Sequence, residues 1–302
     1  MAESIRKENL LAHLQQIVGD RNAVTRVREL RRAADYITAQ FQSFGYRTRY
    51  DDNRALWRDY PNIIAELPDA PADAPLLIIG AHYDGVMGSP AADDNASGIA
   101  ALLEIARVVS CSRASVNRGR ETALHRSAST PAVRLQLIAF TLEEQSMLGS
   151  SHHAQQLAGL HTPLAGMVSL EMVGYKSDAP GSQQLPEGLA HLYPNVGNFI
   201  GVVGNETSRA LVEKFVIPMK SVEGLPVESL VVPGDGEAIP PTRLSDHSPF
   251  WDAGYPALMI TDTSWFRNPH YHQSTDTIDT LDLGFMAKVA DGVVRAVEVM
   301  LK

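Results

Sequence analysis

The amino-acid sequence predicts an α/β fold, in which a central, mixed but mostly parallel sheet is covered by helices on both faces. Apolar runs of strand length alternate with stretches of helical periodicity through most of the 302 residues. Residues 76–81 are apolar throughout, as expected for a strand buried on both faces in a parallel sheet. Together these patterns indicate a three-layer α/β/α sandwich.

The chain opens with two amphipathic helices, in which apolar side chains recur every three or four positions, over residues 10–18 and 27–41. Strands are expected where short apolar runs occur, at residues 46–50, 62–67, 76–81, 133–140, 167–172, 199–203, 227–232 and 257–261. Further helices are expected where apolar positions have helical spacing, at residues 97–109, 147–157, 207–216 and 283–301.

Two polar stretches interrupt this alternation and are interpreted as surface loops. Residues 110–131 are rich in serine and arginine, and residues 177–198 contain several prolines and glycines after a predicted strand. The sequence shows no internal repeat and no clear interdomain linker. Residues 1–302 are therefore interpreted as a single domain with two excursions.

Composition and charge exclude several classes of protein. Hydrophobic residues make up 44% of the chain and charged residues 20%, which is ordinary for a globular protein. No apolar run approaches the roughly 20 residues that a membrane helix requires. The net charge of −9, from 26 basic and 35 acidic residues, disfavours nucleic acid as a partner.

The single cysteine, Cys111, limits the chemistry that the chain can support. One cysteine builds neither a disulfide framework nor a thiolate zinc site, so any metal must bind histidine and carboxylate side chains. The charged N-terminus lacks the apolar core of a signal peptide, and a cytoplasmic location is expected.

Histidine and acidic residues follow the ends of several predicted strands. His82 comes after residues 76–81, and Asp84 lies two positions later, on the same side of an extended backbone. Glu143 and Glu144 follow residues 133–140 in the same way. Glu171 ends an apolar strand, where a carboxylate is costly unless it is paired or bound to a metal. Ligand sites of open α/β sheets lie at such strand ends.

Asp94 and His272 complete the set, and the ordinary structural interpretation of each residue must be weighed against a metal site. Asp94 precedes a predicted helix and could cap it, and Thr141 with Glu144 has the spacing of a capping box. The order His, Asp, Glu, Glu, His along successive strand ends favours a metal site instead. There, one of the paired glutamates would bind the metal and the other would take a proton from a metal-activated water.

These motifs resemble those of a family of co-catalytic zinc peptidases, which includes bacterial leucyl aminopeptidases, aminopeptidase Y, glutamate carboxypeptidases and also glutaminyl cyclases. The matching segments are His82-Tyr83-Asp84, residues 93–98, Glu143-Glu144, residues 170–174 and Tyr271-His272. The resemblance implies the fold of zinc peptidases, which belongs to the phosphorylase/hydrolase-like folds.

The resemblance also implies two Zn²⁺ ions bridged by Asp94. The ligands of one ion would be His82, Asp94 and Glu171, and those of the other would be Asp94, Glu144 and His272. Most peptidases of the family have aspartate where this chain has Glu171. Because the Glu171 side chain is longer, two alternatives stay open: a site that binds one ion, and a site that binds Mn²⁺ or Co²⁺ in place of zinc.

The same resemblance assigns three catalytic roles. Glu143 would be the general base, Asp84 would orient His82, and Tyr271 would hydrogen-bond the tetrahedral intermediate. The peptide bond after Asp94 would be cis. His247, Arg267 and His270 are predicted to contact the substrate, because His247 lies in a motif of the family and the other two lie near His272 in the sequence.

The predicted function is that of a zinc aminopeptidase, which hydrolyses the N-terminal peptide bond of a peptide. Three alternatives stay open on the same fold: cyclisation of N-terminal glutamine by one zinc ion, a carboxypeptidase with Arg267 on the substrate carboxylate, and a non-catalytic binding scaffold. A candidate at every ligand position disfavours the scaffold. Neither nucleic acid nor a membrane is expected as a partner.

Overall fold

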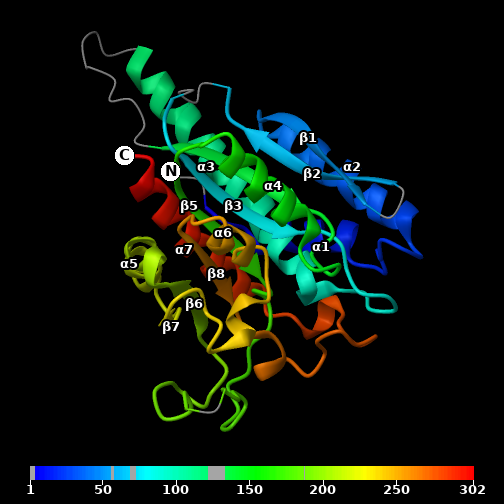
Figure 1. Cartoon of the computed structure of the whole chain (residues 1–302), viewed down its shortest axis with the longest axis vertical. Coiled ribbons are helices and arrows are strands. Elements are labelled where there is room, and N and C mark those ends of the chain that lie inside the picture. Colours follow the sequence, from blue (N-terminus) through cyan, green and yellow to red (C-terminus); the bar gives the residue numbers. More distant parts are fainter. Residues whose placement is uncertain (1–3, 56–57, 69–72, 122–132, 187) are drawn as a thin grey trace.

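The computed structural model describes residues 4–55, 58–68, 73–121, 133–186 and 188–302. Its strands form one eight-stranded sheet in the order β1-β2-β4-β3-β5-β8-β6-β7 (Figure 1). The strands are β1 (Arg47–Ala55), β2 (Arg58–Glu66), β3 (Leu76–His82), β4 (Arg134–Phe140), β5 (Leu164–Glu171), β6 (Ile200–Asn205), β7 (Val227–Val232) and β8 (Ala257–Thr261). The mixed, mostly parallel sheet expected from the sequence is confirmed.

The four central strands, β4, β3, β5 and β8, run in the same direction. Antiparallel pairs flank them, because β2 pairs with both β1 and β4, and β6 pairs with β8. The carboxyl ends of the four central strands therefore meet at one edge of the sheet. Ligand sites of open α/β sheets lie at such an edge.

Helices cover both faces of the sheet (Figure 1). One core lies under α1 (Lys7–Ile17), α2 (Val27–Ser43), α3 (Gly98–Glu121), α5 (Arg209–Lys220) and α7 (Leu283–Met300). The opposite core lies under α4 (Leu148–Gly159) and the short α6 (Ser248–Asp252). Leu77 and Ile79 of β3 enter the first core, and Leu76 and Ile78 enter the second. Because successive strand side chains alternate between faces, this burial on both sides explains the uninterrupted apolar run.

The prediction of a surface loop over residues 110–131 is wrong for its first half. Helix α3 continues to Glu121, since serine and arginine do not end a helix and no proline occurs between Ser110 and Pro131. Residues 122–131 lie outside the described residues. The other predicted excursion, 177–198, is irregular wherever it is described, with one isolated bridge between Pro180 and Val196.

Within the described ranges, no helix is both long enough and apolar enough to cross a membrane.

Candidate metal centre

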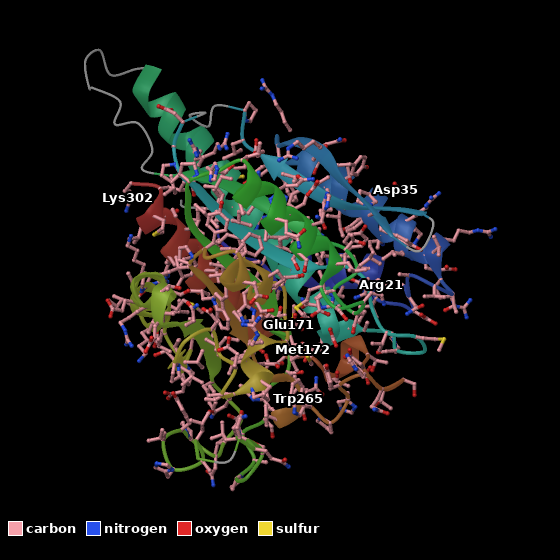
Figure 2. The ribbon with its side chains drawn as sticks, viewed as in Figure 1. Arg21, Asp35, Glu171, Met172, Trp265 and Lys302 are labelled. Carbon is pink, nitrogen blue, oxygen red and sulfur yellow. The ribbon has the colours of Figure 1, made fainter. Side chains whose placement is uncertain are left out.

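Elements far apart in the sequence bring the predicted ligands together. His82 ends β3, Glu144 follows β4, Glu171 ends β5 and His272 lies on the loop after β8. Asp94 lies on η1 (Ala92–Ser97), a turn that leads into α3 and has non-helical backbone angles at Asp94 and Asn95. Figure 2 shows Glu171 among the side chains at this edge of the sheet.

The first group of candidate ligands is His82, Asp94 and Glu171, which are all buried. The Nε2 atom of His82 lies 3.3 Å from Oδ1 of Asp94 and 3.5 Å from Oε2 of Glu171. One ligand atom from each residue lies within 4.8 Å of the other two, a spacing that could hold a metal ion.

The second group shares Asp94 and adds Glu144 and His272. The Nε2 atom of His272 lies 3.0 Å from Oδ2 of Asp94 and 3.4 Å from Oε2 of Glu144. The two groups therefore use different oxygens of the Asp94 carboxylate. That geometry suits a carboxylate that bridges two ions.

Three observations of the protein itself test whether these residues fit metal ions. In the described part of the chain, both ring nitrogens of the buried His82 lack a hydrogen-bond partner, as does Oε1 of Glu144. Burial, followed by the negative charge of Asp94, raises the pKa of Glu144 to about 7. Imidazole and carboxylate are ligands that Zn²⁺ accepts. A divalent cation would satisfy the unpaired nitrogens and neutralise the clustered carboxylates, so the residues fit.

The histidine pKa values also respond to this acidic cluster. Although burial lowers it most, the Glu171 and Glu143 carboxylates hold the pKa of His82 well above its usual range. In the same way, hydrogen bonds to Asp94 and Glu144 outweigh burial and raise the pKa of His272 to about 10. A cation at either group would replace these protons.

Glu143 is in neither group of candidate ligands, although it faces both. Its Oε2 atom lies 4.0 Å from Nε2 of His82. Burial raises the pKa of Glu143 well above its usual range, and the nearby charges of Glu171 and Glu144 act in the same direction. A raised pKa makes this carboxylate a stronger base than one in water.

Asp84 connects His82 to the paired glutamates. Its Oδ1 atom lies 3.5 Å from Nδ1 of His82, the ring nitrogen that faces away from the other carboxylates. The same carboxylate accepts hydrogen bonds from the backbone N–H groups of Glu143 and Glu144, each at 3.2 Å. Asp84 therefore positions three residues of the centre at once.

The backbone of η1 is held from both sides. The carboxylate of Asp276 accepts hydrogen bonds from the N–H groups of Asp93 and Asp94, at 2.9 and 3.2 Å. The side chain of Asn95 donates to the backbone oxygen of Leu170 on β5. The peptide bond between Asp94 and Asn95 is cis, as expected.

Two further residues lie beneath Glu171. Ser245 donates a hydrogen bond of 2.8 Å to Oε2 of Glu171, which fixes the orientation of that carboxylate. Asp246 is fully buried, and neither of its side-chain oxygens has a hydrogen-bond partner among the described residues. Burial raises the pKa of Asp246 to about 7.

Arg21 supports the centre from the connection between α1 and α2 (Figure 2). The side chain is 1% exposed. Its guanidinium donates to five backbone carbonyls, those of Ile17, Gly19, Tyr83, Pro90 and Ala91. Tyr83 directly follows His82, and Ala91 lies just before η1. Arg21 thus ties together the two ends of the segment between His82 and Asp94.

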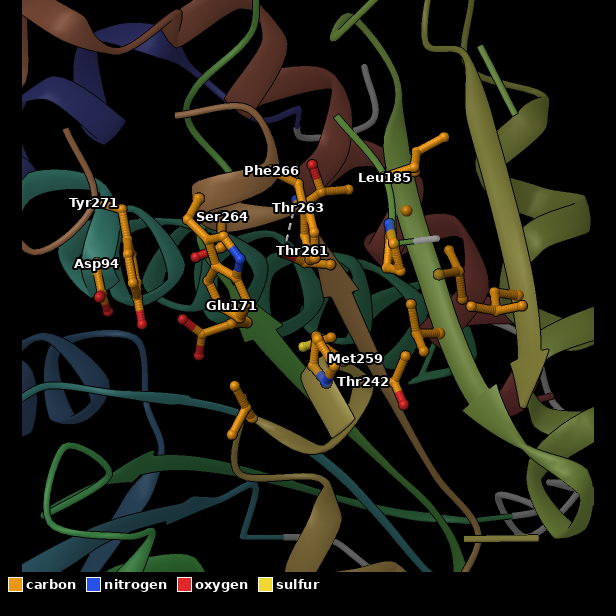
Figure 3. Close-up of a pocket in the computed structure, with 18 of the residues that line it drawn as sticks. Asp94, Glu171, Leu185, Thr242, Met259, Thr261, Thr263, Ser264, Phe266 and Tyr271 are labelled. Carbon is orange, nitrogen blue, oxygen red and sulfur yellow. Dashed lines mark hydrogen bonds between the residues drawn. The ribbon is translucent and has the colours of Figure 1, made fainter. Parts of the chain in front are cut away.

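A cavity of about 320 Å³ opens beside the two groups of ligands (Figure 3). Asp94, Glu171 and Tyr271 lie at one end of it, and Leu185 lies toward the other (Figure 3). The Tyr271 ring stacks on the His272 ring with centroids 3.8 Å apart. Most of the remaining wall is apolar, and it includes Trp265, Phe266 and Met259.

The three residues predicted to contact substrate do not line this cavity. His247 is fully buried and its Nε2 atom lies 2.8 Å from the backbone oxygen of Thr242. Arg267 is 6% exposed and donates to Gln183 and to the backbone oxygen of Phe199. His270 bonds Thr275. Each of these side chains holds a loop through these contacts, and contact with substrate stays a prediction.

The sequence patterns predicted no role for Arg21, Ser245 or Asp276. The available signals were weak. An arginine between two helices and a serine beside Asp246 are ordinary at any surface, and their contacts join residues 60 or more positions apart in the sequence. The Asp276 side chain reaches across 183 positions to the Asp93 backbone.

The chain is similar to known proteins in sequence and in fold. The chain is 38% identical to YfbL, an uncharacterized protein of Escherichia coli K12, over 95% of this chain and 85% of YfbL. It is 28% identical to a probable leucine aminopeptidase of Trichophyton verrucosum, over 97% of this chain and 73% of that one. Among solved structures, the Legionella pneumophila LapA aminopeptidase superposes with a TM-score of 0.73 at 21% identity, over 99% of this chain and 73% of LapA.

The sequence profile of peptidase family M28 matches residues 62–297, and this range contains every candidate ligand described above. Because the match spans most of the chain, the protein belongs to peptidase family M28 and is a zinc metallopeptidase.

Proposed function

We propose that this protein is a di-zinc aminopeptidase, which hydrolyses the first peptide bond of a peptide. One ion would be held by His82, Asp94 and Glu171. The other would be held by Asp94, Glu144 and His272. Bound zinc ions would polarise the scissile carbonyl and lower the pKa of an attacking water toward about 7.

The observation that carries the choice of an aminopeptidase is the charge of the cavity. Asp94, Glu143, Glu144 and Glu171 line it, and no lysine or arginine does within the described part of the chain. Three of these carboxylates would hold zinc, so the choice rests on the missing cationic side chain: a C-terminal carboxylate would find no lysine or arginine of the cavity wall to pair with. Arg267, the candidate for that contact, does not line the cavity and donates to the backbone oxygens of Phe199 and Tyr175.

Glu143 is the proposed general base. Its carboxylate lies free of both ligand groups. It accepts a proton from the attacking water and afterwards donates this proton to the nitrogen of the leaving peptide. Asp84 keeps the Glu143 backbone and the His82 ring in place during both transfers.

Tyr271 is proposed to stabilise the transition state. Its ring is fixed by stacking on His272, and its side chain lines the cavity beside Asp94 and Glu171 (Figure 3). From there the hydroxyl donates a hydrogen bond to the carbonyl oxygen as negative charge develops on it.

The experiment uses protein freed of metal by a chelator and then titrated with ZnCl₂. The substrates are leucine 4-nitroanilide, its N-acetyl derivative, an N-blocked dipeptide with a free C-terminus, and a peptide with N-terminal glutamine. We expect zinc-dependent hydrolysis of leucine 4-nitroanilide and no hydrolysis of its N-acetyl derivative. Cleavage of the blocked substrates, or cyclisation of the glutaminyl peptide without hydrolysis, would contradict the proposal.

A further inference from the structure

The cavity extends away from the ligands, across the face of the sheet, to the edge strand β7. Strand pairing places four residues in one row: Glu171 beside Thr261, Thr261 beside Gly201, and Gly201 beside Glu228. All four line the cavity. Neighbouring strands lie about 4.8 Å apart, so the backbones of Glu171 and Glu228 are separated by about 14 Å. We call the part of the cavity over Thr261, Gly201 and Glu228 the trough.

Glu228 is on the face of β7 that carries the trough. Val227 belongs to the core under α5 and α7, whereas Val232 belongs to the opposite core with Trp251. Because side chains alternate along a strand, Glu228 and Leu230 share the face of Val232. This is the face on which the cavity lies.

The floor and roof of the trough are apolar or small. Gly201 has no side chain, which keeps the middle of the row open. The adjacent row of the floor consists of Met259, Val203 and Leu230, which pair across β8, β6 and β7. Leu185, Leu189 and Tyr193 from the excursion after β5 line the other side. The hydroxyl of Tyr193 donates a 3.0 Å hydrogen bond to the backbone oxygen of Ser229, which ties this segment to β7.

Glu228 leaves an uncompensated negative charge at the far end of the trough. Its side chain is half-buried, and it makes no ion pair or hydrogen bond with any described residue. Burial raises the pKa of the neighbouring Tyr193, and the Glu228 charge adds to the effect. The trough thus has apolar walls along its length and an unpaired carboxylate at its end.

We propose that the trough binds the side chain of the N-terminal residue and selects lysine and arginine. Their long apolar stems would lie on Gly201, Thr261 and Met259, and their cationic ends would pair with Glu228. A leucine side chain is too short to reach that carboxylate, and an acidic side chain would be repelled by it. The inference rests on the proposed aminopeptidase function, because it needs an N-terminal residue bound at the metal end.

The test compares substrates whose N-terminal side chains differ in charge and in length. The kcat/KM values of zinc-loaded protein are measured for the 4-nitroanilides of lysine, arginine, norleucine, leucine and glutamate. Norleucine has the apolar stem of lysine without the ammonium group. We expect lysine and arginine to exceed norleucine, and glutamate to be the poorest substrate.

The matched variants are Glu228→Gln, which removes the charge with little change of shape, and Glu213→Gln, which makes the same change on the exposed side of α5. Glu228→Gln is expected to lower kcat/KM for lysine and arginine by about 10- to 100-fold, mainly through KM, as for a lost charge-assisted hydrogen bond. The norleucine value should be unchanged, and Glu213→Gln should alter none of them.

Two results would overturn the inference. One is norleucine or leucine turned over better than lysine by the wild type, which would make the trough a site for apolar side chains. The other is an unchanged lysine value in Glu228→Gln. If no unblocked substrate is hydrolysed, the proposed function fails instead. Calorimetric binding of L-lysinamide against L-norleucinamide then still tests the trough, since the inference expects Glu228→Gln to abolish the preference for lysinamide.

Discussion

The two groups of candidate ligands differ in how firmly the chain holds them. The first group, His82, Asp94 and Glu171, is buried. Its residues lie on the central strands β3 and β5 and on η1. The second group depends on His272, whose side chain is 35% exposed on a loop after β8. His82, by contrast, is 0% exposed.

This difference suggests a division of labour between the two positions. The buried group is supported by Asp84, by Ser245 and by the hydrogen bonds of Arg21 to the backbone, so its geometry is fixed before any ion binds. The second group opens onto the cavity beside Tyr271, where a peptide can approach. We therefore expect tighter binding at the buried position and easier exchange at the exposed one.

The largest expected effect separates the two groups directly. His82→Ala removes a buried ligand and should leave dialysed protein without either ion, because the exposed position exchanges its ion easily, whereas His272→Ala should lose the exposed ion and keep the buried one. Metal analysis of dialysed protein measures the ions per chain. Equal losses from both variants would contradict the difference between the groups.

Glu143→Gln should separate catalysis from metal binding. The substitution keeps the shape of the side chain but removes the base, so kcat should fall by at least about 100-fold. The metal content should be unchanged, because Glu143 is in neither ligand group. Glu144→Gln is the matched control, and it should lower the occupancy of the exposed position as well as kcat. Near-normal turnover in Glu143→Gln would remove its assigned role.

The stability of metal-free protein should depend on pH through two carboxyl groups, one near the exposed group of ligands and one near the buried group. Burial raises the pKa values of Glu144 and Asp246 to about 7, above their unfolded values. The folded state then binds more protons than the unfolded state, so stability is lost as the pH rises from about 4.5 through 7. One pKa unit corresponds to about 1.4 kcal/mol, so the expected loss is about 3 to 4 kcal/mol for each group.

Urea denaturation of chelated protein at pH 5 and at pH 8 measures this loss. Added zinc should stabilise the protein more at pH 8, because ions replace the protons that the cluster otherwise needs. Stability of chelated protein that rises over this interval would show that the carboxylates are paired in some other way.

The smallest expected effect concerns the support of the buried group. Ser245→Ala removes the hydrogen bond to Glu171 and should weaken zinc binding by about 10-fold. Competition with a chromogenic chelator measures the affinity. Thr275→Ala, which removes the partner of His270 near the exposed group, should change the affinity of the buried ion much less. An equal loss of zinc affinity in both variants would contradict a specific role of Ser245 in supporting the buried group.

The sequence was most informative where a local pattern carries the structure. The apolar run of β3 predicts a strand by itself, because burial on both faces leaves no polar position. The acid at the end of β5 stands out in the same way, because a lone buried Glu171 is costly. The order of the strand ends then brought the five ligands together in the prediction.

Long-range contacts could not be predicted in the same way. Arg21 acts on backbone oxygens more than 60 positions away, and Glu228 is brought to the cavity by the pairing of four strands, β5, β8, β6 and β7. Nothing in the sequence reveals that register. Arg267 was assigned to substrate because it is near His272 in the chain, yet its side chain turns toward Phe199 and Gln183.

The most direct test of the account is the activity of chelated protein as zinc is added back, measured as turnover of an unblocked aminoacyl 4-nitroanilide against the number of ions bound per chain. Two groups of ligands sharing Asp94 predict that turnover rises to its maximum at two ions per chain. Full turnover at one ion, or turnover without any ion, would contradict it.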